Sequence, residues 1–173
     1  MEETTSASKD TRTRTIRWHD PGEFAARARS MGGLEILRAL AKGEIPQPPF
    51  AELIGLRLTV VEPARVTFEF EPAEYMYSPL GTVHGGLLTT VLDSAMGCAL
   101  HTTLPAGVTY TTIELKVNFN RPVSKRTGPM SAEGRVLHPG GTVATAEARL
   151  VDRSGAMYAH ATSTLMVLRP RSG

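Results

Sequence analysis

The chain has few of the features that mark secreted and membrane proteins. Its 173 residues include a single cysteine, Cys98, so no internal disulfide can form and a secreted disulfide framework is not expected. No run approaches the ~18 apolar residues of a membrane span. The first fifteen residues are polar and lack the apolar segment of a signal peptide. We therefore expect a cytoplasmic protein without a membrane anchor.

A strong charge bias is also missing. Lys and Arg number 19 against 17 Asp and Glu, which gives a net charge of +2, and aromatic residues make up only 6%. No basic stripe or RNA-binding aromatic motif occurs, so a nucleic-acid partner is not expected. The five histidines are scattered along the chain. Because zinc sites need clustered ligands, we expect no metal, and no redox cofactor either.

The residues that are present divide the chain into three predicted segments. Residues 1–15 are rich in Thr, Ser and charge and are predicted to form a disordered tail. Residues 16–48 are predicted to form a helical extension, with one short helix after Asp20 and another over 34–42. Closely spaced prolines then indicate a stiff link into a main domain over 49–168.

The main domain is predicted to be a set of strands around one long helix. Hydrophobic patterning places the helix over 85–103, between a hairpin of two strands and four later strands expected to form a meander. Alanines alternate along the last two strands, which indicates a sheet face that the helix approaches closely. The strand over 110–120 is predicted to direct Ile113, Leu115, Val117 and Phe119 to one face. This order indicates an α+β fold, with the helix on one face of an antiparallel sheet.

The start of the long helix is the most informative segment. His84-Gly85-Gly86 opens it, and the glycines expose backbone N–H groups at the positive end of the helix. Such a helix end can bind an anion or a carbonyl oxygen. Asp93 lies off the apolar stripe of the same helix, and a carboxylate is costly there unless something uses it.

These two groups are too far apart to act together within one molecule. From Gly85 to Asp93 the helix rises by ~12 Å, whereas a reacting carbonyl must lie near 3 Å from both groups. If they serve one reaction, a second, antiparallel copy of the helix must supply the missing group. The sequence therefore predicts a two-fold dimer with shared sites.

The motifs over residues 77–93, 110–115 and 118–122 resemble the hotdog-fold thioesterases of the phenylacetyl-CoA thioesterase (PaaI) type. The similarity covers roughly residues 33–168. It implies a hotdog fold, in which an antiparallel sheet of about six strands wraps a long central helix. It also implies hydrolysis of acyl- or aryl-CoA thioesters to the free acid and coenzyme A.

The resemblance also implies roles for individual residues. The Gly85 N–H points at the thioester carbonyl oxygen, and Asp93 of the opposite subunit acts as nucleophile or as base for water. His84 orients the loop, and Thr112 matches a residue that assists the acid's water. Ser78 stands where the family has Asn or Gln, so the usual positioning group is absent. The expected assembly is a homodimer or a homotetramer built from two dimers.

Further residues are candidates for contact with the substrate. Gly97 stands where some relatives have Thr and is expected to leave room for a wider acyl group. The cations after the strand over 110–120 could bind coenzyme A phosphates, or they could be solvated loop charges. The full set of substrate-binding candidates is Gly86, Thr90, Gly97, Arg121, Lys125 and Arg126.

Three other interpretations are weaker. The chain has no Gly-x-Ser-x-Gly motif, which excludes the serine-esterase interpretation of His-Gly-Gly. Cys98 and His101 lie three residues apart, but Cys98 continues the apolar helix and is expected in the core. A hotdog hydratase would need an Asp–His pair that we do not find. The main alternative is a non-catalytic acyl-CoA-binding hotdog module, which the missing Asn or Gln at position 78 keeps open.

Overall fold

A computed structural model describes residues 11–170 and shows one antiparallel sheet of six strands around a long helix, α4 (Gly85–His101). The strands are β1 (Arg57–Glu62), β2 (Arg65–Phe70), β3 (Thr109–Phe119), β4 (Met130–His138), β5 (Val143–Asp152) and β6 (Met157–Leu168). Two short 3₁₀ turns, Glu74–Met76 and Lys125–Thr127, lie in the connections. The predicted α+β fold with one central helix is confirmed.

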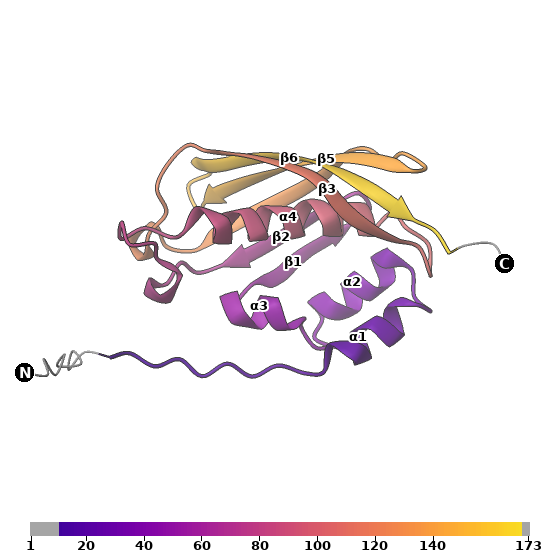
Figure 1. Cartoon of the computed structure of the whole chain (residues 1–173), viewed down its shortest axis with the longest axis horizontal. Helices are drawn as coiled ribbons and strands as arrows, with labels where there is room; N and C mark the ends of the chain where they lie inside the picture. The colour runs from indigo at the N-terminus through magenta and orange to yellow at the C-terminus, as the bar shows by residue number, and fades with distance from the viewer. Residues whose placement is uncertain (1–10, 171–173) are drawn as a thin grey trace, which may run out of the picture.

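Three helices precede the sheet and lie below α4 in Figure 1: α1 (Pro21–Ala28), α2 (Gly33–Ala41) and α3 (Pro49–Ile54). Asp20 caps α1 as predicted, because its Oδ1 accepts a hydrogen bond of 2.8 Å from the Gly22 N–H. Helix α3 was not predicted. The prolines before it indicated a link, but proline is also favourable in the first turn of a helix.

The predicted tail over 1–15 falls only partly within the described residues, since 1–10 lie outside them. Residues 11–20 form neither helix nor strand. They are held against the domain at Arg14, whose Nη1 donates to the Leu53 carbonyl at 2.6 Å. The Arg14 guanidinium also lies 3.7 Å from the centroid of the Tyr75 ring. This part of the predicted tail therefore contacts the folded domain.

The sheet order is β1-β2-β4-β5-β6-β3, which corrects one prediction. Strands β4, β5 and β6 form the expected meander, but β3 pairs with β6 and not with β4. The link over 120–129 carries the chain from one sheet edge to the middle, where β4 pairs with β2. Strand β3 is therefore an edge strand that follows α4 in sequence and lies beside it.

A bulge in β3 corrects a second prediction. The pairing with β6 shifts register between Thr112 and Glu114, so Ile113 is an extra residue on the bulged strand. Ile113 is 50% exposed and does not share a face with Leu115. Uninterrupted alternation would have put Thr112 on the face opposite Leu115. The bulge instead lets both residues face α4, because their β6 partners Leu165 and Ser163 are buried.

The predicted small-residue face of the sheet is where α4 packs. All the small residues of this face are fully buried or nearly so: Ala144, Ala146, Ala148, Ala159, Ala161 and Ser163. Gly134 on β4 shows how close the helix comes, since an added Cβ would lie 2.2 Å from the Ala95 carbonyl oxygen. Larger residues at these positions would push α4 away from the sheet.

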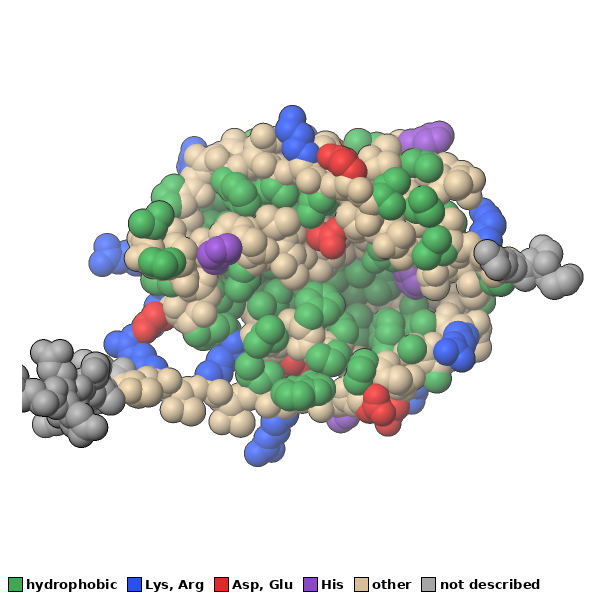
Figure 2. Space-filling model, viewed as in Figure 1, with side chains coloured by type: hydrophobic (Ala, Val, Ile, Leu, Met, Phe, Trp, Pro, Cys, Tyr) green, Lys and Arg blue, Asp and Glu red, His purple; other side chains and the backbone are tan. Residues whose placement is uncertain are grey.

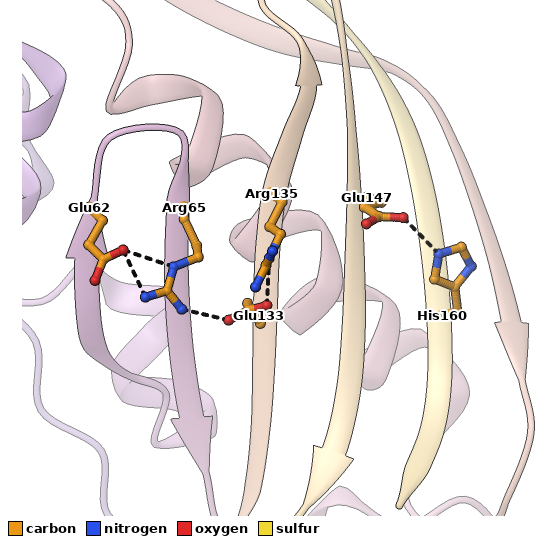
Figure 3. A network of polar contacts seen from close by, with 6 residues as sticks. All are labelled: Glu62, Arg65, Glu133, Arg135, Glu147 and His160. Atoms are coloured by element: carbon orange, nitrogen blue, oxygen red, sulfur yellow. Dashed lines mark hydrogen bonds and ion pairs between the residues drawn. The ribbon is translucent and has the colours of Figure 1, made fainter. Parts of the chain in front are cut away.

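The opposite face of the sheet carries charge. Figure 3 shows two separate groups of polar contacts on this face. Ion pairs connect Glu62, Arg65, Glu133 and Arg135, and a second contact joins Glu147 to His160. In the first group, Arg65 bridges Glu62 and Glu133 at 2.8 Å and 2.7 Å. This face is therefore a polar surface, and the core lies between the other face and α4. Within residues 11–170, no helix has the length and apolar character needed to span a bilayer.

Candidate active site

The loop before α4 is fixed by backbone hydrogen bonds on both sides. The His84 N–H donates to the Met76 carbonyl at 2.9 Å, and the Val83 N–H donates to the Val123 carbonyl at 2.8 Å. His84 then caps the helix, because its Nδ1 accepts from the Gly86 N–H at 2.9 Å. Since Nδ1 is the acceptor, a neutral His84 ring carries its proton on Nε2. The predicted orienting contact of His84 with the helix start is present.

This cap leaves one donor of the first helical turn unused. The Gly86 N–H binds His84 Nδ1, and the Leu87 N–H binds the His84 carbonyl at 2.9 Å. Within residues 11–170, no acceptor takes the Gly85 N–H. A donor at the positive end of a 17-residue helix is suited to a carbonyl oxygen that gains negative charge. The sequence singled out the same N–H.

A hollow of about 300 Å³ lies in front of Gly85. Its walls come from the loop over 82–85 and from the end of β3 with the residues that follow it, including Phe119 and Arg121. The Phe119 ring lies close, because a Cβ added to Gly85 would be 3.2 Å from its Cζ. A larger residue at position 85 would crowd the Phe119 ring, and glycine avoids this contact.

Asp93 lies two turns further along α4, half-buried, and is held by β3. The Thr112 hydroxyl donates to Asp93 Oδ1 at 2.9 Å. This contact exists because the bulge at Ile113 turns Thr112 toward the helix. The structure thus brings together two residues that the sequence assigned to one site.

Asp93 lies in the wall of a second, larger cavity of about 430 Å³. Figure 2 shows a hollow lined by hydrophobic side chains between α4 and the N-terminal helices. The side of the cavity formed by helices α1–α3 and the segment between α2 and α3 consists of Phe24, Leu37, Leu40, Gln47, Pro48, Phe50 and Ala51. The opposite side consists of Phe68, Asp93, Ser94, Cys98, His101, Thr109 and Tyr110. A carboxylate at the edge of an apolar cavity of this size is typical of a ligand site.

The hollow at Gly85 and the cavity at Asp93 share no lining residue. Gly85 and Asp93 of one chain therefore line different spaces. This agrees with the separation of ~12 Å expected from eight residues of helix.

Cys98 and its neighbours are poorly suited to catalysis. Burial among apolar atoms raises the pKa of the Cys98 thiol to about 12, so the nucleophilic thiolate is disfavoured. Burial also lowers the pKa of His101 and raises that of Tyr110 well above its ordinary value. Cys98 is only partly buried because it opens onto the cavity, and it is not a fully enclosed core residue. Within residues 11–170, no group of three His, Cys, Asp or Glu residues could hold a metal ion.

Of the predicted site residues, only Gly85, Arg121 and Asp93 line one of these two spaces, and Ser78, Thr90 and Gly97 are among those that line neither. Ser78 is in the loop, where its Oγ accepts from the Leu80 N–H at 3.3 Å. Thr90 is exposed and donates to the Gly86 carbonyl at 3.0 Å. Gly97 makes room for Tyr110, because an added Cβ would lie 2.4 Å from the Tyr110 hydroxyl. Any effect of Gly97 on the cavity is therefore transmitted through the Tyr110 ring.

The three predicted cations are exposed and spread around the hollow at Gly85. Arg121 lines this hollow, and its guanidinium lies 5.9 Å from the Tyr158 ring centroid. Lys125 lines a separate hollow of about 470 Å³ together with Arg12 and Arg14. Arg126 follows Lys125 in the same 3₁₀ turn. Glu74 also lines the hollow of Lys125 and forms an ion pair with Arg12, so part of the positive charge there is neutralised.

The sequence analysis missed the contribution of the N-terminal helices to the site. It assigned no function to residues 16–48, yet Phe24, Leu37, Leu40 and Gln47 line the cavity beside Asp93. The apolar face of the helix over 34–42 was the available signal, because it had to pack against something. Gln47 gave no signal, since it lies within a proline-rich stretch.

Comparisons with known proteins agree on one family. The model of the thioesterase superfamily matches residues 80–159. A candidate esterase of Saccharolobus solfataricus is 31% identical over 120 residues, which cover 69% of this chain and 84% of that protein. The 1,4-dihydroxy-2-naphthoyl-CoA hydrolase of Listeria monocytogenes is 23% identical, with 69% of this chain and 96% of that protein covered.

Solved structures show the same fold. A candidate thioesterase of Ralstonia eutropha, described as related to phenylacetic acid degradation, has a TM-score of 0.68 and 26% identity. The match covers 75% of this chain and 98% of that one. The hotdog fold and the likeness to the phenylacetyl-CoA thioesterase type are both confirmed.

Proposed function

The chain belongs to the thioesterase superfamily and is a thioester hydrolase, and we propose that it hydrolyses acyl-CoA thioesters at a site shared between two subunits. The main support for this proposal is that α4 carries both the Gly85 N–H and the Asp93 carboxylate. One helix offers an unused N–H at Gly85 and, two turns later, a carboxylate at the edge of an apolar cavity. The Listeria relative hydrolyses a CoA thioester, which supports coenzyme A as the leaving group.

The Gly85 N–H is proposed to bind the thioester carbonyl oxygen. As the carbonyl carbon is attacked, negative charge develops on this oxygen, and the N–H and the helix dipole stabilise it. One such donor is typically worth about 3–4 kcal/mol in the transition state. The His84 cap holds the first turn rigid, so the donor is in place before the substrate arrives.

Asp93 of the partner subunit is proposed to act on the carbonyl carbon, either directly as nucleophile or by taking a proton from a water that attacks. As a base, Asp93 takes a proton from water, the water oxygen bonds to the carbonyl carbon, the C–S bond breaks, and the thiolate of coenzyme A receives that proton. As a nucleophile, Asp93 bonds to the carbonyl carbon, the C–S bond breaks and the thiolate is protonated by solvent, and water then hydrolyses the resulting anhydride to the free acid and restores Asp93. The Thr112 hydroxyl orients one carboxylate oxygen through its bond of 2.9 Å, so the other oxygen is available for the reaction.

A partner subunit fits the free edge of the sheet. Strand β3 has 11 residues and pairs with β6 on one side only, and no other described strand pairs with it. Ile113 and Phe119 on this strand are 50% and 51% exposed. Long edge strands with exposed apolar residues favour pairing with another chain. Pairing of β3 with its two-fold copy would place two α4 helices side by side in opposite directions, and two such dimers could form a tetramer.

The cations on the Gly85 side are proposed to bind the phosphates of coenzyme A. Arg121 lines the hollow at Gly85, and Lys125 lies with Arg12 and Arg14 in a neighbouring hollow. A thioester whose carbonyl oxygen binds Gly85 would then direct its coenzyme A toward these charges. Its acyl group would extend toward Asp93 and the apolar cavity of the partner.

Turnover of a panel of aryl, short, medium and long acyl-CoAs tests this proposal, with the released thiol as the readout. Asp93→Asn should lower kcat at least about 100-fold, the usual effect of losing a general base or nucleophile. Asp20→Asn is the matched control, because Asn caps a helix as well as Asp and residue 20 lies outside both spaces. Wild-type turnover by folded Asp93→Asn, or no turnover of any acyl-CoA by the wild type, would contradict the proposal.

A further inference from the structure

The wall of the cavity beside Asp93 contains a buried polar atom that no described residue satisfies. Gln47 lines the cavity, and its Oε1 is buried without a hydrogen-bond partner among the described residues. A buried amide oxygen loses its bonds to water, so leaving it unpaired is unfavourable. Such an atom in a native structure indicates a missing partner, and in a ligand cavity the ligand can supply it.

The other polar side chains of the cavity do not donate a hydrogen bond to Gln47 Oε1. The Ser94 hydroxyl donates to the Thr90 carbonyl at 2.7 Å, within α4 itself. The Tyr110 hydroxyl lies against Gly97 and next to Cys98. Asp93 is bound by Thr112 on the opposite wall. The remaining neighbours of Gln47 on its side of the cavity are apolar: Phe24, Leu37, Leu40, Pro48, Phe50 and Ala51.

We infer that Gln47 is a specificity-determining residue that selects acyl groups carrying a hydrogen-bond donor, a hydroxyl or an N–H, at the end away from the thioester. The inference rests on the proposed function, since it places the thioester carbonyl near Asp93 and the acyl group in the cavity. The apolar walls bind the body of the acyl group, and the Gln47 oxygen accepts the donor. An acyl group without the donor leaves this oxygen unpaired and binds less tightly.

The cavity also limits the size of the acyl group. An apolar cavity of ~150 Å³ holds one benzene ring of six carbons, so the space of about 430 Å³ beside Asp93 holds at most about 17 non-hydrogen atoms. Helices α1–α3 close one side of the cavity, and the hollow opens to the surface in Figure 2, so a longer chain would extend into solvent. Carbons beyond the cavity gain no further burial, and the expected substrates are therefore acyl groups of medium length.

The test measures binding to Asp93→Asn, which cannot consume the ligand. Straight-chain acyl-CoAs of about 8, 10 and 12 carbons, each ending in methyl, hydroxyl or methoxy, cover the expected size range. Titration calorimetry should give a Kd at least about tenfold lower for the hydroxyl than for the methyl compound at the best-fitting length. The methoxy compound can accept but not donate, so it should bind like the methyl compound.

When Gln47→Leu is added to Asp93→Asn, the hydroxyl and methyl compounds should have nearly equal Kd values. Ser94→Ala is the matched control: it removes a hydroxyl from the same cavity, but one already bonded within α4, so the ratio of the two Kd values should persist. A ratio near one at every length, or a ratio unchanged by Gln47→Leu, would overturn the inference. Equal binding of the methoxy and hydroxyl compounds would also overturn it, because the amide would then be donating.

The outcome separates this inference from the proposed function. If wild-type protein hydrolyses the panel but shows no Gln47-dependent preference, the inference fails and the hydrolase assignment stands. If the preference is present in binding but no acyl-CoA is hydrolysed, the catalytic proposal fails and the role of Gln47 stands.

Discussion

The two functional positions of α4 lie in contrasting surroundings. At its start, Gly85 faces a hollow formed by loops, with Arg121 in its wall and further cations nearby. At its middle, Asp93 faces a cavity lined mainly by apolar side chains, and helices α1–α3 close it on one side. The first environment suits the charged part of a ligand, and the second suits an apolar part.

This difference supports the proposal that the two groups act on one thioester only in a pair of subunits. An acyl-CoA has a polar coenzyme A part and an acyl part joined at the thioester. The donor lies on the side of the cations and the acid on the side of the apolar cavity, with no lining residue in common. Two antiparallel α4 helices would bring the Gly85 hollow of one subunit next to the Asp93 cavity of the other.

The largest expected effect comes from removing the Gly85 donor. Gly85→Pro eliminates the N–H, and His84 already has the extended conformation (φ −61°, ψ 131°) that a residue before proline prefers. We expect kcat to fall about 100- to 1000-fold, the range for losing one oxyanion donor. The measurement compares the acyl-CoA turnover of the folded Gly85→Pro variant with that of the wild type.

Gly85→Ala is the matched control for this variant. Its Cβ meets the same Phe119 ring at 3.2 Å, but the N–H is retained. A loss of activity in Gly85→Ala as large as in Gly85→Pro would show that crowding against Phe119, and not the missing donor, causes the defect.

A smaller effect is expected at the acid end, where Thr112 orients Asp93. Thr112→Val keeps the shape of the side chain but removes the bond of 2.9 Å to Oδ1. A bond to a charged group contributes about 1.5–3 kcal/mol, so kcat should fall tenfold or more if the full contribution is felt in the transition state. Thr111→Val, on the exposed side of the same strand, should leave kcat unchanged. Equal effects of the two substitutions would contradict the orienting role.

The smallest effect is expected at Ser78, which belongs to the loop on the Gly85 side. Its hydroxyl accepts from the Leu80 N–H at 3.3 Å and lines neither space. Ser78→Ala should therefore lower kcat/KM only about two- to threefold, the low end for a neutral hydrogen bond. Ser78→Asn restores the amide that the family has at this position and should raise kcat/KM. A tenfold loss in Ser78→Ala would place this hydroxyl in the reaction.

Most of the fold could be predicted because its signals are local. The glycine pair and the apolar stripe predict α4, and strand patterning predicts two strands before it and four after it, as observed. The position of β3 and its bulge could not be predicted in this way. Both depend on the pairing of β3 with β6, and β6 starts 38 residues after β3 ends. The prediction that Ile113 shares a face with Leu115 is wrong for this reason.

The catalytic half of the candidate site was more accessible to sequence reasoning than the binding half. His84, Gly85 and Asp93 lie within one helix and its cap, so their spacing alone indicates their relation. The cavity residues come from α1, α2, α3, α4 and two strands, and only the folded chain brings them together. Gln47 in particular has no motif around it, and its importance comes from the burial of one oxygen atom.

Complementation between two inactive variants tests the shared site most directly. Gly85→Pro and Asp93→Asn are each expected to be inactive, and mixed dimers of the two contain one site with both functional groups intact. Co-expression with two different affinity tags allows the mixed dimers to be purified and their turnover of an acyl-CoA to be measured. Our account predicts that mixed dimers regain up to about half of the wild-type activity, since one of two sites is restored. Mixed dimers that form and remain as inactive as the parent variants would contradict it.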